Sequence, residues 1–269
     1  MKKIFTLASA MMIAMSAMAY DTATEGTAYY GSSCCAYGLA DGTVAITTYY
    51  LDTDNPTTEI TLPATIQVWN EDGTEMTAEY EVSQVGYSTW NNLWVSDGTD
   101  TNVLSTITSI TISEGIKTIN TSAFGWMTSP ALTTVTLPST MTLIKAGAFA
   151  WCDNLTSITC NATTAPTLDS SEGWGDHFKG NSSWDKITTS CKVYVPSEEA
   201  QATYNPATWS YWTEFYNNDN VVVASSDGIE TLTTATATPD APAYNLAGQR
   251  VANGTKGLMI KNGKKMIVK

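Results

Sequence analysis

The clearest pattern in the chain is a set of apolar positions that recurs after 25 residues without a gap. A period of about 20 to 30 residues is typical of a solenoid, whose units bury their apolar faces by stacking on one another. The matching positions in the two copies are Ile107, Ile110, Ile112, Ile116, Ile119, Ala123, Phe124, Trp126 and Met127 in the first, and Leu132, Val135, Leu137, Met141, Ile144, Ala148, Phe149, Trp151 and Cys152 in the second.

Alternating apolar and polar residues within each unit predict a short strand. In "LTTVTL" (132–137) the leucine and valine side chains face inward and the threonines face outward. Pro138 ends this strand because proline has no N–H group for a ladder. A second extended piece, "MTLI" or "IKTI", follows, and the Ala-Phe-x-Trp segment then turns the chain. The ten positions expected to form the repeat scaffold are Ile107, Ile110, Ile112, Ile119, Phe124, Leu132, Val135, Leu137, Ile144 and Phe149.

Two further copies are less regular. One begins 23 residues later with Leu155, Ile158 and Cys160 and degenerates at "ATTAPTL". The other comes earlier: "EITLPATI" matches "TVTLPSTM", and "YEVSQVGYSTW" matches "MTLIKAGAF", with an insertion at 67–79 between them. Each unit alone is too small to bury its apolar side, so the repetition indicates a continuous stacked core.

The unit "LTTVTLPSTMTLIKAGAFAWCDNLTSIT" resembles the BspA-like leucine-rich repeat of bacterial cell surfaces. That family alternates a Leu-x-x-Val-x-Ile-Pro strand with an Ile-x-x-x-Ala-Phe-x-x-Cys turn. Cys152 occupies the cysteine position of the turn, whereas Met127 departs from it, so Cys152 is expected to be a buried apolar filler. The resemblance covers roughly residues 41–216, because "DGTVAITTYY" resembles the opening strand of these arrays and residues 192–215 resemble their closing unit. Ser197 is the expected N-cap of a helix in "SEEAQATY", with two glutamates in its first turn.

We therefore expect a mainly β fold: a leucine-rich-repeat-like solenoid of short strands with irregular turns, a short helix near its C-terminal cap, and a small β-hairpin tail module. Residues 1–19 read as a signal peptide, since two lysines precede an apolar run that ends in Ala17-Met18-Ala19. The solenoid is expected over 20–222 and a linker rich in Thr, Ala and Pro over 223–243. The mature chain is expected to have no transmembrane segment.

The last segment, 244–269, predicts strands around glycine turns and a hairpin through Asn262-Gly263. It resembles a short type IX secretion sorting domain. The residues that match are Tyr244, Leu246, Gly248, Val251, Lys256, Gly257, Ile260, Gly263, Lys264 and Lys265. The alternative is a small β-module without a sorting role.

The charge is unevenly distributed. The 26 acidic residues lie between Asp21 and Asp240 against five basic ones, which leaves −21 in that stretch, whereas residues 244–269 carry +6 and no acid. An acidic body repels phosphate backbones, which argues against nucleic-acid binding. The simplest role of this acidity is to keep an exported protein in solution.

Little in the sequence indicates catalysis or metal binding. The single histidine, His177, has no nucleophile or orienting partner nearby in the sequence, and "LDTDNPTTE" and "SDGTD" lack the glycine and distal glutamate of a calcium loop. These aspartates fit turns instead. We therefore expect no enzyme activity, no cofactor and no metal. Export permits disulfides among the five cysteines; Cys160–Cys191 is the first pair to test, and the pairing of Cys34 and Cys35 stays open.

Aromatic residues are the remaining candidates for ligand contact. Trp126 and Trp151 recur in the repeat and are expected to pack in the scaffold. The irregular Trp90, Trp94, Trp174 and Trp184 are candidate ligand contacts, because exposed tryptophans stack on sugars or anchor interfaces.

Together, the resemblance and the export signals imply a secreted or cell-surface protein on the exterior of the outer membrane. It would act in adhesion by binding host matrix proteins or other cells through a face rich in Thr and Ser. The alternatives are a glycan-capture protein, a polysaccharide hydrolase, or an envelope component without a ligand.

Overall fold

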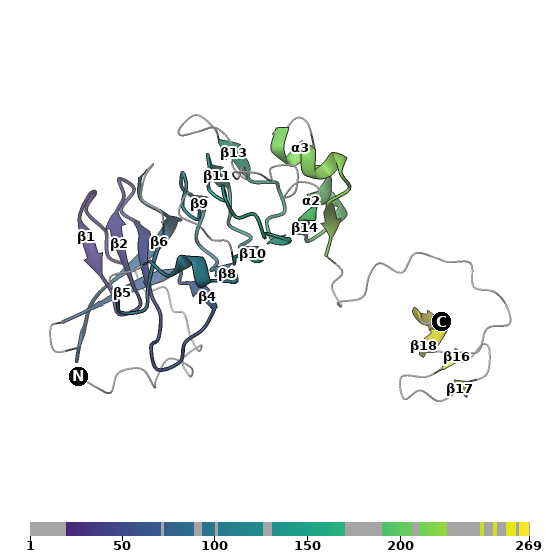
Figure 1. Cartoon of the computed structure of the whole chain (residues 1–269), viewed down its shortest axis with the longest axis horizontal. Coiled ribbons are helices and arrows are strands. Elements are labelled where there is room, and N and C mark those ends of the chain that lie inside the picture. Colours follow the sequence, from purple (N-terminus) through teal and green to yellow (C-terminus); the bar gives the residue numbers. More distant parts are fainter. Residues whose placement is uncertain are drawn as a thin grey trace. The chain divides into compact units, whose positions relative to one another are not determined.

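The computed structural model describes residues 20–70, 73–88, 93–99, 102–125, 131–169, 190–205, 210–224, 243–244, 250–251, 257–261 and 264–268. The chain divides into two units, Met1–Val222 and Val223–Lys269, which we describe separately (Figure 1). The signal peptide predicted at 1–19 and most of the predicted linker lie outside the described residues.

One sheet of the first unit collects the first strand of every repeat. Its order is β15-β14-β12-β10-β8-β4, and neighbours from β4 to β14 pair in parallel. Ile60, Ile110, Val135, Ile158 and Val193 share one row of this register. All five are buried, so the solenoid core runs beneath the sheet. The strands are β4 (Glu59–Leu62), β8 (Ser109–Ile112), β10 (Thr134–Leu137), β12 (Ser157–Cys160), β14 (Lys192–Val195) and β15 (Val221–Val223).

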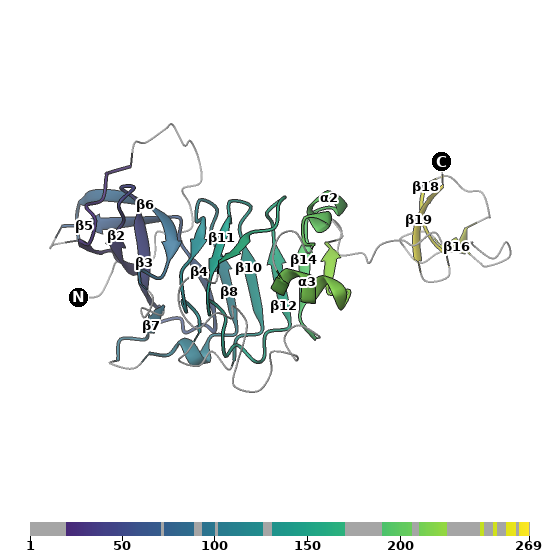
Figure 2. The same ribbon diagram turned by 90° about the horizontal axis from the view of Figure 1, so that it is seen from above.

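The second sheet collects the other strand of each repeat and continues into the N-terminal part, in the order β1-β2-β3-β6-β9-β11-β13 (Figure 2). The insertion at 67–79 belongs to a hairpin in which β5 pairs with the first half of β6. β7 pairs with the second half of β3. The strands are β1 (Ala28–Tyr30), β2 (Cys34–Gly38), β3 (Val44–Tyr50), β5 (Thr65–Trp69), β6 (Met76–Val85), β7 (Trp94–Ser96), β9 (Thr118–Ile119), β11 (Leu143–Lys145) and β13 (Thr167–Asp169).

The ten expected scaffold residues all lie in the core between the two sheets. None of them exposes more than 2% of its surface. Phe124 and Phe149, 25 residues apart, stack with their ring centroids at 5.3 Å. Burying an aliphatic or aromatic side chain contributes about 1.5–3 kcal/mol to the free energy of unfolding. Stacked repeats therefore stabilise one another mainly through this column of buried side chains.

The turn between the strands uses a left-handed backbone at the same place in successive repeats. Ser122 has φ 57° and Gly147 has φ 67°, and the two are 25 positions apart. Glycine adopts this conformation at no steric cost, whereas a side chain makes it unfavourable by about 1–2 kcal/mol. Ser122 is therefore the strained member of the pair.

Two helices close the C-terminal end of the first unit. The predicted short helix is confirmed as α2 (Glu198–Ala202), and the Ser197 side chain accepts a hydrogen bond from the Ala200 N–H at 3.1 Å. The second helix, α3 (Ser210–Asn217), carries Trp212 into the core, where the indole N–H donates to the Pro166 carbonyl at 2.8 Å. Trp212 thus covers the last repeat. A single 3₁₀ turn, η1 (Leu104–Thr106), precedes β8.

Cys160–Cys191, the first pair to test for a disulfide, is not bonded: all five cysteines are buried free thiols. In the β12–β14 register Thr159 aligns with Tyr194, so Cys160 and Cys191 stand four positions out of register. At about 3.3 Å per residue that offset is roughly 13 Å, whereas a disulfide needs Cα atoms about 4.4–6.8 Å apart. Burial raises the pKa of the Cys191 thiol to about 12 and raises the pKa of Cys152, which fills the core as expected.

The second unit contains a small antiparallel sheet in the order β17-β16-β18-β19. Lys261 pairs with Lys264, so the expected hairpin connects β18 and β19 across Asn262-Gly263. That two-residue connection, like several of the sorting-domain positions, lies outside the described residues. The strands are β16 (Ala243–Tyr244), β17 (Arg250–Val251), β18 (Gly257–Lys261) and β19 (Lys264–Val268).

Candidate ligand-binding face

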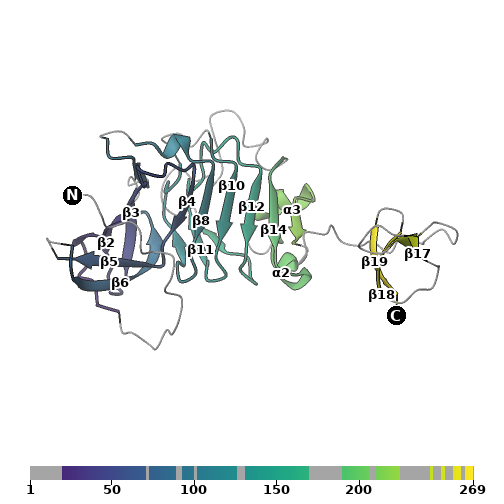
Figure 3. The same ribbon diagram turned by 90° about the horizontal axis from the view of Figure 1, so that it is seen from below.

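The solvent side of the six-stranded sheet carries a regular grid of polar side chains, which we call the outer strand face. Figure 3 shows its strands side by side. Alternate residues of each strand point away from the core and are exposed or half-buried. The outer strand face consists of Glu59, Thr61, Ser109, Thr111, Thr134, Thr136, Ser157, Thr159, Lys192 and Tyr194.

The strand register arranges these side chains in two straight rows. One row runs Glu59–Ser109–Thr134–Ser157–Lys192, and the other runs Thr61–Thr111–Thr136–Thr159–Tyr194. Neighbours in a row are about 4.8 Å apart, and the rows are roughly 7 Å apart, since they lie two residues apart on each strand. The sequence therefore places hydroxyl groups on a fixed two-dimensional lattice.

A second set of threonines, just before each strand, is used by the scaffold itself. The Thr108 hydroxyl donates to the Thr58 carbonyl at 3.2 Å, Thr133 donates to Thr108 at 3.0 Å, and Thr156 donates to Thr133 at 3.1 Å. These bonds connect successive repeats. Part of the high threonine content is thus structural.

The hydroxyl groups of the outer strand face are not used in this way. Within the described residues, the hydroxyls of Thr111, Thr134, Thr136 and Thr159 make no hydrogen bond to another side chain or to the backbone. A hydroxyl can both donate and accept, so these groups can pair with peptide or sugar partners. The grid is therefore suited to forming many hydrogen bonds with a partner across the outer strand face.

The two ends of one row carry opposite charges. Glu59 lies exposed on the edge strand β4, and Lys192 lies on β14, where its Nζ donates to Asn220 Oδ1 at 2.7 Å. Tyr194 ends the other row. Sequence reasoning missed Tyr194, although the alternation in "KVYV" marks it as an outward residue.

Of the four candidate tryptophans, the structure describes Trp94, and Trp94 does not lie on the outer strand face. Trp94 lies on β7 of the other sheet and exposes 39% of its surface. Trp90, Trp174 and Trp184 lie outside the described residues, as do Trp126 and His177. Trp151 is half-buried in the repeat turn with a left-handed φ of 72°. The structure thus describes one of the four candidate aromatics, and describes it as exposed.

The closely spaced aspartates stabilise turns. Asp52 Oδ1 accepts the Asp54 N–H at 3.0 Å. Asp97 Oδ1 accepts the Thr99 N–H at 3.1 Å and its hydroxyl at 2.6 Å, which lowers the pKa of Asp97. In the part of the chain that the structure describes, no three His, Cys, Asp or Glu side chains group together as metal ligands would.

Comparisons with known proteins found two solved structures with some similarity to this chain. A solved leucine-rich repeat protein from Bacteroides capillosus is 24% identical, with a TM-score of 0.40, and the match covers 63% of this chain and 99% of that one. A solved leucine-rich cell surface protein from Faecalibacterium prausnitzii is 19% identical, with a TM-score of 0.26; the match covers 65% of this chain and 56% of that one. No curated protein matches.

The decisive match is to a family model described as "BspA type Leucine rich repeat region", which finds six copies within residues 102–201. These residues include β8, β10, β12 and β14, the central strands of the outer strand face. Residues 102–201 are therefore similar to the BspA-type leucine-rich repeat region.

Proposed function

We propose that this protein is an exported, surface-displayed binding protein that uses its outer strand face for adhesion to host matrix proteins or to other cells. The observation that carries the proposal is the grid of threonine and serine hydroxyls that the fold leaves uncommitted, in contrast to the threonines that hold the repeats together. Such a surface supports a role in binding rather than in catalysis.

The energetics favour many weak contacts over one strong site. A single hydrogen bond contributes about 0.5–1.5 kcal/mol, so a few hydroxyls alone give weak affinity. A rigid sheet costs little further ordering when it binds, because its strands are fixed by the core. Several copies displayed on one cell would bind a matrix fibre multivalently, which raises the overall avidity.

The ends of the chain support display outside the cell. Residues 1–19 have the pattern of a signal peptide, and residues 244–269 resemble a short sorting domain. No helix within the described ranges is long and apolar enough to cross a membrane. We propose that the tail directs display, and we expect its removal to reduce surface accessibility of the chain on intact cells.

The test is a binding screen of the purified chain against immobilised matrix proteins and a panel of polysaccharides at physiological salt. Saturable binding to a matrix protein is the expected result. Exclusive binding to a polysaccharide would support glycan capture instead, a function that the exposed Trp94 favours. Absence of binding to matrix proteins, cells and polysaccharides would contradict the adhesion proposal.

A further inference from the structure

The N-terminal part of the chain is acidic without any compensation. From Tyr20 to Ile116 the sequence contains fourteen Asp and Glu residues and no lysine, arginine or histidine. No basic side chain within this stretch therefore offsets its negative potential. Lys117, the first base after this stretch, acts on Asp41 and helps to lower its pKa, and the other acids of the stretch have no base within it.

A β-bulge turns the second half of β3 toward solvent in this region. Ala36 pairs with Ile46 and Cys35 pairs with Thr48, so Thr47 is the extra residue. Ile46 is fully buried, whereas Thr48 is half-buried and Tyr50 is exposed, on the face whose Cys35 side chain is itself buried. A bulge reverses which side chains point to solvent, and here it brings Tyr50 to the surface.

Three exposed aromatic side chains gather around this bulge, and we call them the aromatic row: Tyr30, Tyr50 and Trp94. Tyr30 pairs with Cys35, Cys35 with Thr48, and Thr48 with Trp94, so these residues share one face of four adjacent strands. The Tyr50 hydroxyl lies 3.0 Å from the Cys35 sulfur, and this hydrogen bond raises the pKa of Tyr50 to about 12.

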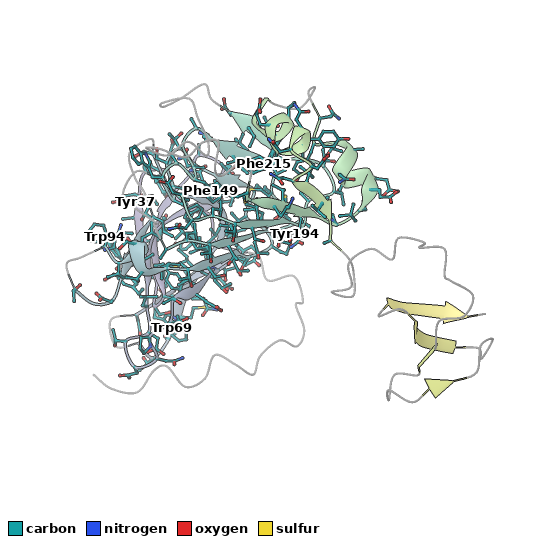
Figure 4. All side chains as sticks on the ribbon, turned by 45° about the vertical axis from the view of Figure 1, so that its right-hand side comes forward. Tyr37, Trp69, Trp94, Phe149, Tyr194 and Phe215 are labelled. Carbon is teal, nitrogen blue, oxygen red and sulfur yellow. The ribbon has the colours of Figure 1, made fainter. Side chains whose placement is uncertain are left out.

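The aromatic row is exposed more than large apolar side chains usually are. Tyr30 exposes 69% of its surface, Tyr50 40% and Trp94 39%. Figure 4 shows Trp94 projecting from the N-terminal part of the first unit. Tyrosine and tryptophan are the residues most enriched in the energetically dominant part of protein interfaces.

Two acidic turns adjoin the end of the aromatic row. The Leu51 N–H donates to the Ser96 carbonyl at 2.8 Å, which continues the β3–β7 pairing past Tyr50. Asp52 and Asp97 are the next residues on the two strands, and a Cβ built on Gly98 would lie 3.8 Å from the Thr53 methyl group. The two turns therefore lie against each other. Asp52 follows Tyr50 by two residues, and Asp97 follows Ser96, the partner of Tyr50 in the β3–β7 register.

We propose that the aromatic row, with the adjoining Asp52 and Asp97 turns, is a docking surface for a lysine- or arginine-rich segment of a partner protein. A guanidinium or ammonium group over an aromatic face gains about 0.5–2 kcal/mol, and carboxylates at the edge add attraction. Charge complementarity selects this partner, since the surrounding sequence supplies acids and no base. The surface is separate from the outer strand face and goes beyond the proposed function.

The test measures binding of the purified full-length chain to a synthetic peptide of alternating arginine and glycine. The matched peptide carries glutamine in place of arginine. We expect the arginine peptide to bind, the glutamine peptide not to bind, and added salt to weaken the binding. Trp94→Ala and Tyr30→Ala should each weaken it roughly three- to tenfold. Tyr216→Ala, which removes an aromatic of 43% exposure on α3, is the control and should change nothing.

Tyr30 projects so far into solvent that Tyr30→Ala will leave the fold intact, which a thermal unfolding curve verifies. Equal affinity of the Tyr30→Ala, Trp94→Ala and unsubstituted chains would overturn the proposal, because binding would then reflect bulk charge alone. Failure of the arginine peptide to bind would also overturn it. So would Trp94-dependent binding of a neutral β-glucan without peptide binding, which would identify the surface as a glycan site.

Discussion

The repeat region and the N-terminal strands β1, β2, β3 and β7, which we call the N-terminal cap, share one sheet but build their exposed surfaces differently. In the repeats, β8, β10 and β12 present the same residue types in perfect register, and the surface is a polar lattice. In the cap, the antiparallel strands β1, β2 and β3, a bulge, and the parallel neighbour β7 present Tyr30, Tyr50 and Trp94 beside acidic turns. The periodic repeats thus produce an extended surface suited to many weak contacts of similar strength. The irregular cap produces a local cluster of aromatic side chains suited to fewer, stronger contacts.

The largest expected effect is a loss of stability from a buried residue of the repeat region, compared with an exposed residue of the N-terminal cap. Phe149→Ala removes one ring of the Phe124–Phe149 stack in a fully buried column and should lower the free energy of unfolding by about 3–5 kcal/mol. Chemical denaturation with urea measures it. Tyr30→Ala in the cap is the matched aromatic control and should change the unfolding free energy by less than about 0.5 kcal/mol. A loss below about 1 kcal/mol for Phe149→Ala would show that the repeats do not depend on this column.

The next effect concerns the cysteines. Cys152→Ser places a hydroxyl in a fully buried site, where the larger thiol fills the core and donates to the Phe124 carbonyl at 3.6 Å, and should cost about 1–3 kcal/mol. A thiol reagent should label the native chain slowly and should label all five cysteines in denaturant without a reductant. Labelling of only three under those conditions would mean that one pair is bonded.

The left-handed turn provides a pair of opposite predictions. Ser122→Gly relieves an unfavourable backbone conformation and should raise the free energy of unfolding by up to about 1 kcal/mol. Gly147→Ala introduces a side chain at the equivalent position and should lower it by about 1 kcal/mol or more. The same sign for both substitutions in thermal or urea unfolding would refute the equivalence of the two turns.

The smallest effect is a pH dependence between repeats. Glu114 accepts hydrogen bonds from the Ser139 N–H at 2.9 Å and the Ser139 hydroxyl at 2.7 Å, and these bonds lower its pKa from 4.5. Its contribution is therefore present above about pH 4.5 and is lost as the pH falls through the lowered pKa. Because Glu114 is exposed, Glu114→Gln should cost only about 0.5 kcal/mol at neutral pH. The difference from the unsubstituted chain should shrink as the pH falls below 4.5 toward and through the lowered pKa, and a difference that does not change with pH would rule out the carboxylate as its cause.

The repeat region could be predicted from the sequence because its signal is periodic and local. The positions of Ile110 and Val135 in the core, the strand end at Pro138 and the Ser197 cap all follow from residue type and spacing. The confirmed recognition of the repeat family depended on several units taken together.

The cap and the cysteine pairing could not be predicted in the same way. The bulge at Thr47 changes which residues face solvent, and nothing in "DGTVAITTYY" marks its position. The error at Cys160–Cys191 arose because the offset between β12 and β14 is set by strand register, which residue counts do not give. Likewise, only the structure distinguishes the structural threonines, such as Thr133, from the uncommitted Thr136.

One binding measurement tests the central claim that the outer strand face makes the contacts. Thr111→Ala with Thr136→Ala removes two neighbouring hydroxyls of one row, and Thr118→Ala with Thr167→Ala removes two from strands of the other sheet. Against whichever matrix protein binds in the screen, the first double variant should raise the dissociation constant about tenfold, the effect of two hydrogen bonds. The second should leave it unchanged. Equal affinities for the two double variants would contradict the account.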